Sequence, residues 1–156
     1  MKAINSPDVT LNIAEVELVY RTKIKASKRP QISDSKLAFQ ILLNSWDHDK
    51  IELVEQFKIL LLNKSNRVLG IAQISSGGIS GTVADPRHIF ALALKANATG
   101  IILSHNHPSG NLKPSSADEL LTEKLRQAGT FLEIKILDHL ILCSDQYYSF
   151  ADEGLI

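Results

Sequence analysis

The residues best suited to chemistry lie in the short segment His105-Asn106-His107. This segment follows the apolar run at residues 100–104 (GIILS), whose pattern predicts a buried strand. Side chains two residues apart on a strand point to the same side, so both imidazoles can reach one metal ion. Neutral imidazole is the commonest protein ligand of zinc. Pro108 and Gly110 then bend the chain sharply.

A carboxylate further along the chain can complete such a site. Asp118 comes eleven residues after His107, one turn into a predicted helix, and can reach back as a third ligand. Three protein ligands and one open position are typical of a catalytic zinc. The alternative needs no metal: Ser115 caps the helix and Asp118 completes the cap three residues later. Because Cys143 is the single cysteine, a site built from several cysteines is excluded.

These residues resemble a known metalloprotease signature. Ser104-His105-Asn106-His107-Pro108, six residues and then Ser115-x-x-Asp118 are similar to the JAMM (JAB/MPN) pattern, which is His-x-His-Pro, six residues and Ser-x-x-Asp, with a Glu upstream. The longer stretches HNHPSG and KPSSAD resemble the RadC branch of that family, as do Asp85-Pro86-Arg87 and Asp138-His139-Leu140-Ile141. The resemblance covers roughly residues 55–150.

The resemblance implies a role for each matching residue. Ser115 would hydrogen-bond the developing oxyanion or the water on the metal. Glu55, which stands at a strand start in the Glu-x-Phe pattern, would be the general acid and base. Glu52 is its nearest competitor, and periodicity alone favours a solvated residue at Glu55. The implied ligands of the zinc ion (Zn²⁺) are His105, His107 and Asp118.

The activity implied by the resemblance is hydrolysis of a peptide or isopeptide bond in a peptide or protein substrate. Zinc lowers the pKa of its bound water to about 7, and a nearby carboxylate takes the proton and passes it to the leaving amine. The alternative function is that of a DNA-repair or DNA-processing accessory protein without proteolytic activity, which is the role that the RadC label names.

Charge argues against nucleic acid as the main partner. The chain has 17 Lys and Arg and 17 Asp and Glu, whereas a dedicated nucleic-acid binder usually has a basic excess. RadC proteins commonly carry an N-terminal helix-hairpin-helix module, for which we expect no room in this chain. Residues 21–29 hold five basic and no acidic residues, and a solvated loop is favoured there over a nucleic-acid patch.

The elements that must position these residues follow from hydrophobic periodicity and turn signals. Strands and helices alternate through the middle of the chain, which predicts an α/β (α+β) fold with a mixed β-sheet flanked by helices. The resemblance implies the layered JAB/MPN, cytidine-deaminase-like sandwich. Residues 75–82 are expected to form a mobile Gly- and Ser-rich loop. Helices are predicted at residues 34–46, 86–98 and 115–128, and strands at 14–24, 57–62, 68–74, 100–104, 132–137, 140–143 and 147–150.

A length of 156 residues fits a single domain. Residues 1–50 are expected to add a strand and a helix to the RadC-like catalytic domain at residues 51–156. His139 is predicted to be buried and hydrogen-bonded, and Cys143 to be a core thiol. Without an apolar run of about 18 residues or a secretory pattern, we expect a cytoplasmic protein with no membrane span. The oligomeric state stays open.

Overall fold

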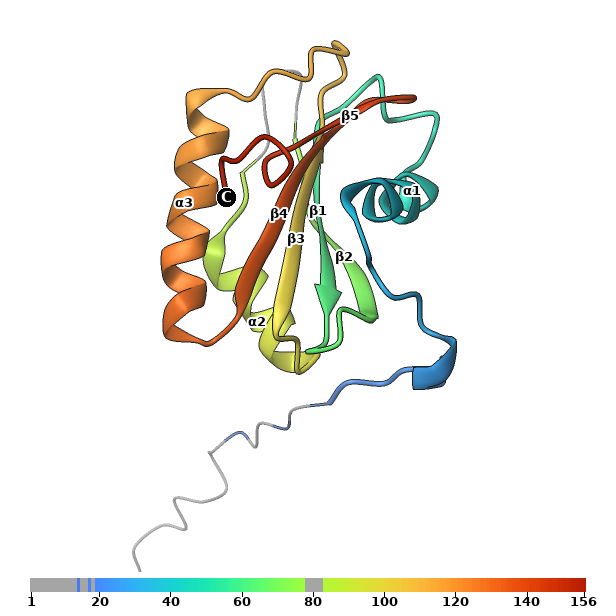
Figure 1. Cartoon of the computed structure of the whole chain (residues 1–156), viewed down its shortest axis with the longest axis vertical. Helices are drawn as coiled ribbons and strands as arrows, with labels where there is room; N and C mark the ends of the chain where they lie inside the picture. Colours follow the sequence, from blue (N-terminus) through green and yellow to red (C-terminus); the bar gives the residue numbers. More distant parts are fainter. Residues whose placement is uncertain (1–13, 15–16, 18, 78–82) are drawn as a thin grey trace, which may run out of the picture.

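The computed structural model describes residues 14, 17, 19–77 and 83–156 (Figure 1). A short 3₁₀ turn, η2, lies at Ala26–Lys28. The helices are α1 (Ser35–Ser45), α2 (Pro86–Lys95) and α3 (Ser116–Phe131). The strands are β1 (Gln56–Leu62), β2 (Val68–Ser76), β3 (Gly100–Asn106), β4 (Lys135–Leu142) and β5 (Tyr147–Ser149).

Within the described residues, the strands form one mixed sheet in the order β2-β1-β3-β4-β5. β1 pairs antiparallel with both β2 and β3, while β4 runs parallel to β3 and antiparallel to β5. A parallel pair needs a long crossover connection, and α3 supplies it between β3 and β4. The predicted mixed sheet flanked by helices is therefore confirmed.

Helices cover both faces of the sheet, as Figure 1 shows. Alternate residues of the central strand β1 divide between two cores because successive side chains point to opposite faces. Phe57, Ile59 and Leu61 belong to the core under α2 and α3. Leu60 and Leu62 belong to the core under α1. His105 pairs with Phe57 across β1 and β3, so its side chain faces the α3 side.

Each helix begins at a polar cap, as the sequence predicts. Asp34 accepts a hydrogen bond from the amide of Leu37, and Asp85 accepts one from Arg87. α2 ends at Lys95 rather than at residue 98, because the chain turns through Asn97 at φ 55°. α3 continues through Gly129 as far as Phe131, beyond the predicted end at residue 128.

Three further details differ from the prediction. The described residues between 14 and 24 form no strand, and the rest of that range lies outside the described residues. The two strands predicted at 132–137 and 140–143 are one continuous strand, β4. Cys143 follows the end of β4 and is half-buried rather than a core thiol, because its Sγ turns to Asp145 and to the carbonyl of Gln146.

The predicted mobile loop at residues 75–82 is only partly described. β2 extends through Ser76, while residues 78–82 lie outside the described residues. None of the helices in the described part of the chain is long and apolar enough to cross a membrane.

Candidate metal centre

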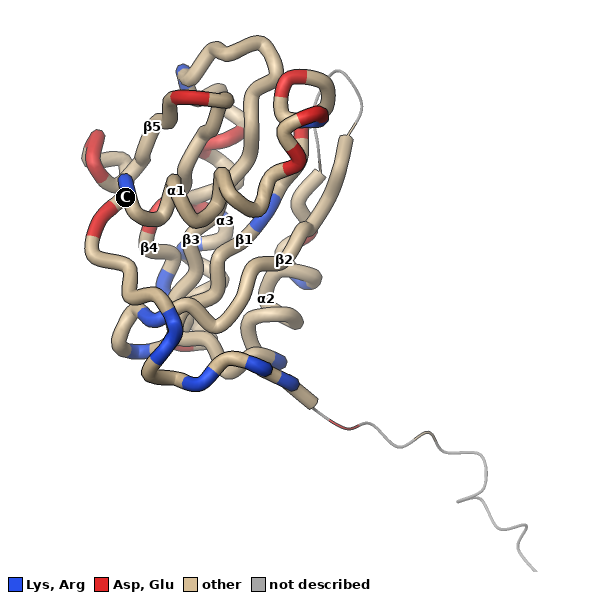
Figure 2. Tube along the Cα trace, turned by 90° about the vertical axis from the view of Figure 1, so that its right-hand side faces the viewer, with Lys and Arg blue, Asp and Glu red and all other residues tan. Residues whose placement is uncertain are grey.

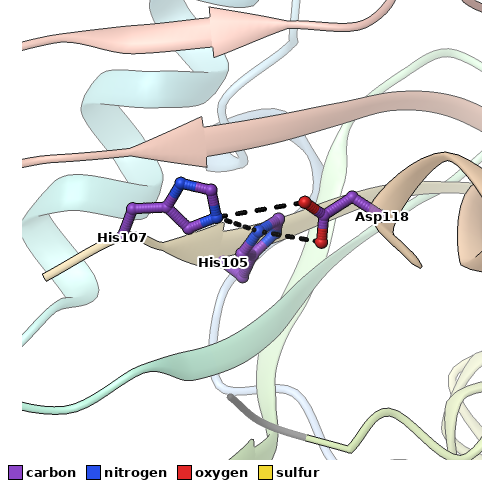
Figure 3. A group of neighbouring side chains, drawn as sticks. All are labelled: His105, His107 and Asp118. Carbon is purple, nitrogen blue, oxygen red and sulfur yellow. Dashed lines mark hydrogen bonds and ion pairs between the residues drawn. The ribbon is translucent and has the colours of Figure 1, made fainter. Parts of the chain in front are cut away.

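The end of β3 and the first turn of α3 bring together the residues that the spacing singled out (Figure 3). Nε2 of His105 lies 2.9 Å from Nε2 of His107 and 3.3 Å from Oδ1 of Asp118. Nε2 of His107 is 4.0 Å from Oδ2 of Asp118. Among the described residues, this is the group of His, Cys, Asp and Glu side chains that could hold a metal ion.

Asp118 combines the two roles that the sequence left open. The amide and the hydroxyl of Ser115 both donate to Oδ2 of Asp118, at 2.7 and 2.6 Å. The amide of Asp118 donates in return to Oγ of Ser115 at 3.2 Å, which completes a capping box. Oδ1 remains directed at His105. One carboxylate can therefore cap the helix with one oxygen and offer the other to a metal.

A hydrogen bond to a backbone carbonyl determines which nitrogen of His107 carries the proton. Nδ1 of His107 hydrogen-bonds the carbonyl oxygen of Asn111, in the turn that follows β3. A carbonyl oxygen can only accept, so Nδ1 must donate. Nε2 of a neutral His107 then carries a lone pair, and it points toward His105 and Asp118.

His105 is connected to a second buried histidine. Its Nδ1 lies 2.8 Å from Nε2 of His139, and Nδ1 of His139 lies 2.6 Å from Oγ1 of Thr122. The burial and hydrogen bonding predicted for His139 are thus confirmed. Burial lowers the pKa of His105 to about 4 and places the pKa of His139 well below its ordinary value. Both rings are neutral at pH 7, which is the state a metal ligand requires.

The arrangement fits a zinc ion. Zn–N and Zn–O bonds of about 2.0–2.1 Å in a tetrahedron place ligand atoms about 3.3 Å apart. The distances of 2.9, 3.3 and 4.0 Å bracket that value, so shifts of less than about 1 Å would admit the ion. The donor set, two imidazoles and one carboxylate, is one that zinc prefers.

Asn106, between the two histidines, has a role that the sequence did not reveal. Its side chain faces away from theirs and is fully buried. Its Nδ2 donates to the carbonyls of Ile51 and Val54, at 2.7 and 2.9 Å, and its Oδ1 accepts from the amide of Gln56 at 2.7 Å. The amide therefore fixes the segment before β1, which carries Glu52 and Glu55, to the strand that carries the histidines.

The structure places Glu55 directly before β1 and half-buried. Phe57 is paired with His105, so Glu55, two residues before Phe57, stands at the end of β1 that adjoins the histidine-bearing end of β3. Glu52 is exposed and lines a cavity of about 340 Å³ that also borders His107 and Cys143. Both carboxylates lie on the side of the site where β1 begins, and the choice between them stays a prediction.

Comparison with known proteins shows the family to which the chain is similar. The model of the RadC-like JAB domain family matches residues 32–155. A UPF0758 protein of Flavobacterium johnsoniae is 44% identical over 158 residues, covering 99% of this chain and 66% of that protein. A UPF0758 protein of Symbiobacterium thermophilum is 33% identical and covers 100% of this chain and 65% of its own length.

Shorter relatives match as well. The UPF0758 protein YeeS of Escherichia coli K12 is 42% identical over 102 residues, which is 65% of this chain and 69% of that protein. The chain spans about two thirds of the length of the first relatives named above.

Proposed function

The chain belongs to the RadC-like JAB domain family, and we propose that it is a zinc-dependent hydrolase that cleaves a peptide or isopeptide bond. One observation carries the proposal. Ligand atoms of His105, His107 and Asp118 all lie within 4.8 Å of one another, and the carbonyl of Asn111 holds the proton of His107 on the far side of its ring. A cation is the simplest partner for three such acceptors.

Each residue has a distinct task in this proposal. Bound zinc would supply a Lewis acid and a water that is acidic near neutral pH. Glu55 would accept the proton of the attacking water and return it to the leaving amine. Ser115 would turn its hydroxyl, which donates to Asp118 in this structure, toward the developing oxyanion.

The metal is tested first, without reference to activity. Asp118→Asn keeps a side-chain oxygen for the capping box but removes the negative charge from the ligand set. Glu119→Gln removes the charge of the neighbouring, exposed carboxylate and serves as the matched control. We expect calorimetry to show one zinc per chain in the wild type and in Glu119→Gln, and at least a roughly tenfold weaker affinity in Asp118→Asn. Equal affinity in all three would reject the ligand assignment.

The base is tested separately, with the zinc-loaded protein and a peptide library whose cleavage is read by mass spectrometry. Glu55→Gln should retain zinc and lose roughly 10²–10⁴-fold in cleavage rate. Glu52→Gln, which changes the neighbouring carboxylate in the same way, should keep its activity. The opposite result would assign the base to Glu52, and loss of zinc in Glu55→Gln would make Glu55 a ligand.

A second candidate function is favoured by the distribution of charge. Figure 2 shows many of the Lys and Arg residues gathered at the end of the molecule where the N-terminal segment lies, while several Asp and Glu residues gather toward the opposite end. Hydrogen bonds of Arg67 and Val68 to the carbonyls of Arg29 and Pro30 hold the N-terminal segment at the basic end. None of the cations of this basic end forms an ion pair with another described residue. These cations are Arg21, Lys23, Lys25, Lys28, Arg29, Lys64, Arg67, Lys95 and Lys135.

Cations clustered in this way, without an ion pair to another described residue, fit the phosphate backbone of a nucleic acid. The test is fluorescence anisotropy with a labelled DNA duplex over a range of salt concentrations. Reversing Lys23, Lys25 and Lys28 to Glu should weaken binding and reduce the salt slope by about 0.9 per lost contact. Reversing the exposed Lys36, Lys113 and Lys124 makes the same charge change elsewhere. Equal losses in the two triple variants would reject the basic end as a binding surface.

A further inference from the structure

Hydrogen bonds link Thr122 to His139 and His139 to His105 in a buried series, which we call the relay. The donor and the acceptor of each bond follow from the bond that Thr122 makes at its other end. Oγ1 of Thr122 lies 2.7 Å from the carbonyl oxygen of Asp118, four residues earlier in α3. Two oxygens at this distance repel unless a hydrogen lies between them, and a carbonyl has none to give. The hydroxyl of Thr122 therefore donates to Asp118.

That donation determines which ring nitrogen of His139, and then of His105, carries the proton. A hydroxyl has one hydrogen, so Oγ1 of Thr122 can only accept from Nδ1 of His139, 2.6 Å away. A neutral His139 protonated on Nδ1 has a lone pair on Nε2. His105 must then donate from its Nδ1 across the 2.8 Å contact. Nε2 of His105 is left with a lone pair that faces the lone pair of His107 at 2.9 Å, and this contact is repulsive until a cation lies between the two nitrogens.

We propose that His139 and Thr122 are positioning residues that fix the tautomer of His105, so that its metal-facing nitrogen is free of a proton before any ion arrives. This inference rests on the proposed zinc site and extends it to two residues that are not themselves among the proposed ligands. Metal-binding histidines usually donate their second N–H to a carboxylate or a carbonyl. Here the acceptor is a neutral imidazole, whose own tautomer must be fixed by a third group.

Packing holds these rings in the orientation that the relay needs. The ring of His139 stacks on Phe150 with centroids 4.8 Å apart, and Phe57 stacks parallel to His105 at 6.0 Å. His139 and Thr122 are both buried, so water cannot replace a missing partner. The relay also closes a ring, because it starts at the backbone of Asp118 and ends at His105, which faces the carboxylate of Asp118.

The test compares two substitutions of one residue. Thr122→Val removes the hydroxyl with little change of shape, whereas Thr122→Ser keeps it. Without the hydroxyl, His139 can carry its proton on Nε2 and donate to His105, which moves the proton of His105 onto the metal-facing nitrogen. Thr130→Val is the matched control, because Thr130 makes the same bond to the carbonyl four residues earlier in α3 without touching a histidine.

Histidine tautomers are read in the zinc-free protein from long-range ¹H–¹⁵N correlations near pH 7. We expect His105 and His139 protonated on Nδ1 in the wild type, Thr122→Ser and Thr130→Val. We expect His105 to be protonated on Nε2, wholly or in part, in Thr122→Val. Zinc affinity measured by calorimetry should fall by roughly tenfold or more in Thr122→Val alone.

Two results would overturn the inference. One is an Nε2 proton on His105 in the wild type. The other is a Thr122→Val protein that keeps both the tautomer and the zinc affinity of the wild type. If the wild type binds no zinc but shows the expected tautomers, the relay stands and the proposed hydrolase fails, so the two failures are distinguishable.

Discussion

At the scale of single residues, one buried amide holds two parts of the site together. Asn106 satisfies three backbone groups, the carbonyls of Ile51 and Val54 and the amide of Gln56, all from the segment that carries the proposed base. The two histidines beside it in sequence face the opposite side of the strand. A change at Asn106 therefore affects the position of Glu55 relative to the histidines without touching either.

We expect Asn106→Ala to lower the free energy of unfolding by about 3 kcal/mol, because it leaves buried backbone donors and acceptors without partners. Asn44→Ala, on the exposed face of α1, should change it by less than about 0.5 kcal/mol. Urea denaturation of the zinc-free proteins measures both values. A cost below about 1 kcal/mol for Asn106→Ala would show that the segment before β1 is held by other contacts.

The residues of the metal cluster could be predicted from sequence, whereas their supports could not. His105, His107 and Asp118 lie within fourteen residues of one another, so strand alternation and a helix start suffice to bring them together. Thr122 and Asn106 gain their roles from partners at His139 and at Ile51, which are brought close only by the sheet. No local pattern distinguishes them from an ordinary helix threonine or a strand-end asparagine.

At the scale of elements, the close packing of α3 against the start of β4 depends on a residue without a side chain. A Cβ added at Gly129 would lie 2.3 Å from the carbonyl oxygen of Ile134, far inside contact distance. The amide of Ile134 donates back to the carbonyl of Gly129 at 2.9 Å. The missing Cβ lets the helix continue past Gly129 and still turn directly into β4, which is why the predicted helix end was too early.

Gly129→Ala should therefore destabilise the protein by roughly 2 kcal/mol, since backbone must shift to relieve the overlap. The control is Gly70→Ala in β2, where an added Cβ meets no atom within 4 Å. Thermal denaturation followed by circular dichroism compares the two. Equal melting temperatures for both variants would contradict the tight approach of α3 to β4.

Asp138, on β4, links this strand to the segment after β5. Its carboxylate accepts from the hydroxyl of Ser149 and from the amides of His139 and Ala151. Burial nevertheless raises its pKa, although these hydrogen bonds oppose the shift. The folded protein thus binds a proton on Asp138 more readily than the unfolded chain does. The contribution of Asp138 to stability is greatest below pH 4 and is lost as the pH rises through the raised pKa.

The matching variant is Asp138→Asn, whose amide oxygen can still accept from the two backbone amides and which does not titrate. We expect the stability of the wild type relative to Asp138→Asn to fall between pH 4 and pH 7. Urea denaturation at several pH values gives this difference directly. A difference that grows with pH would mean that the hydrogen bonds outweigh burial.

Element types and the mixed sheet were predictable because caps, apolar runs and turns are local signals. The sequence did not predict that residues 132–137 and 140–143 form one strand, because Asp138 and His139 look like a polar interruption between two strands. They are accommodated inside β4 since each finds buried partners. The strand predicted before residue 24 shows the opposite case: alternation alone did not form a strand at the described residues of that range.

At the scale of the whole molecule, zinc binding should be coupled to global stability. The three proposed ligands come from the end of β3 and the first turn of α3, so an ion that bridges them stabilises the folded state alone. At a free zinc concentration 100 times the Kd, this linkage is worth about 2.7 kcal/mol. For a chain of 156 residues we expect the melting temperature to rise by roughly 5–10 °C.

Differential scanning calorimetry with and without zinc tests this expectation, with Asp118→Asn as the variant that should show little shift. An equal shift in both proteins would locate the stabilising zinc elsewhere on the chain.

The separation of charge described above has a practical consequence. The sequence has a pI near 7.0 and no net charge, so it predicts weak retention on any ion exchanger near neutral pH. A resin bead, however, meets one end of the molecule at a time. The protein should be retained by both cation-exchange and anion-exchange columns at pH 7 and low salt, in opposite orientations. Its chromatography would then report a polarity that the count of charged residues conceals.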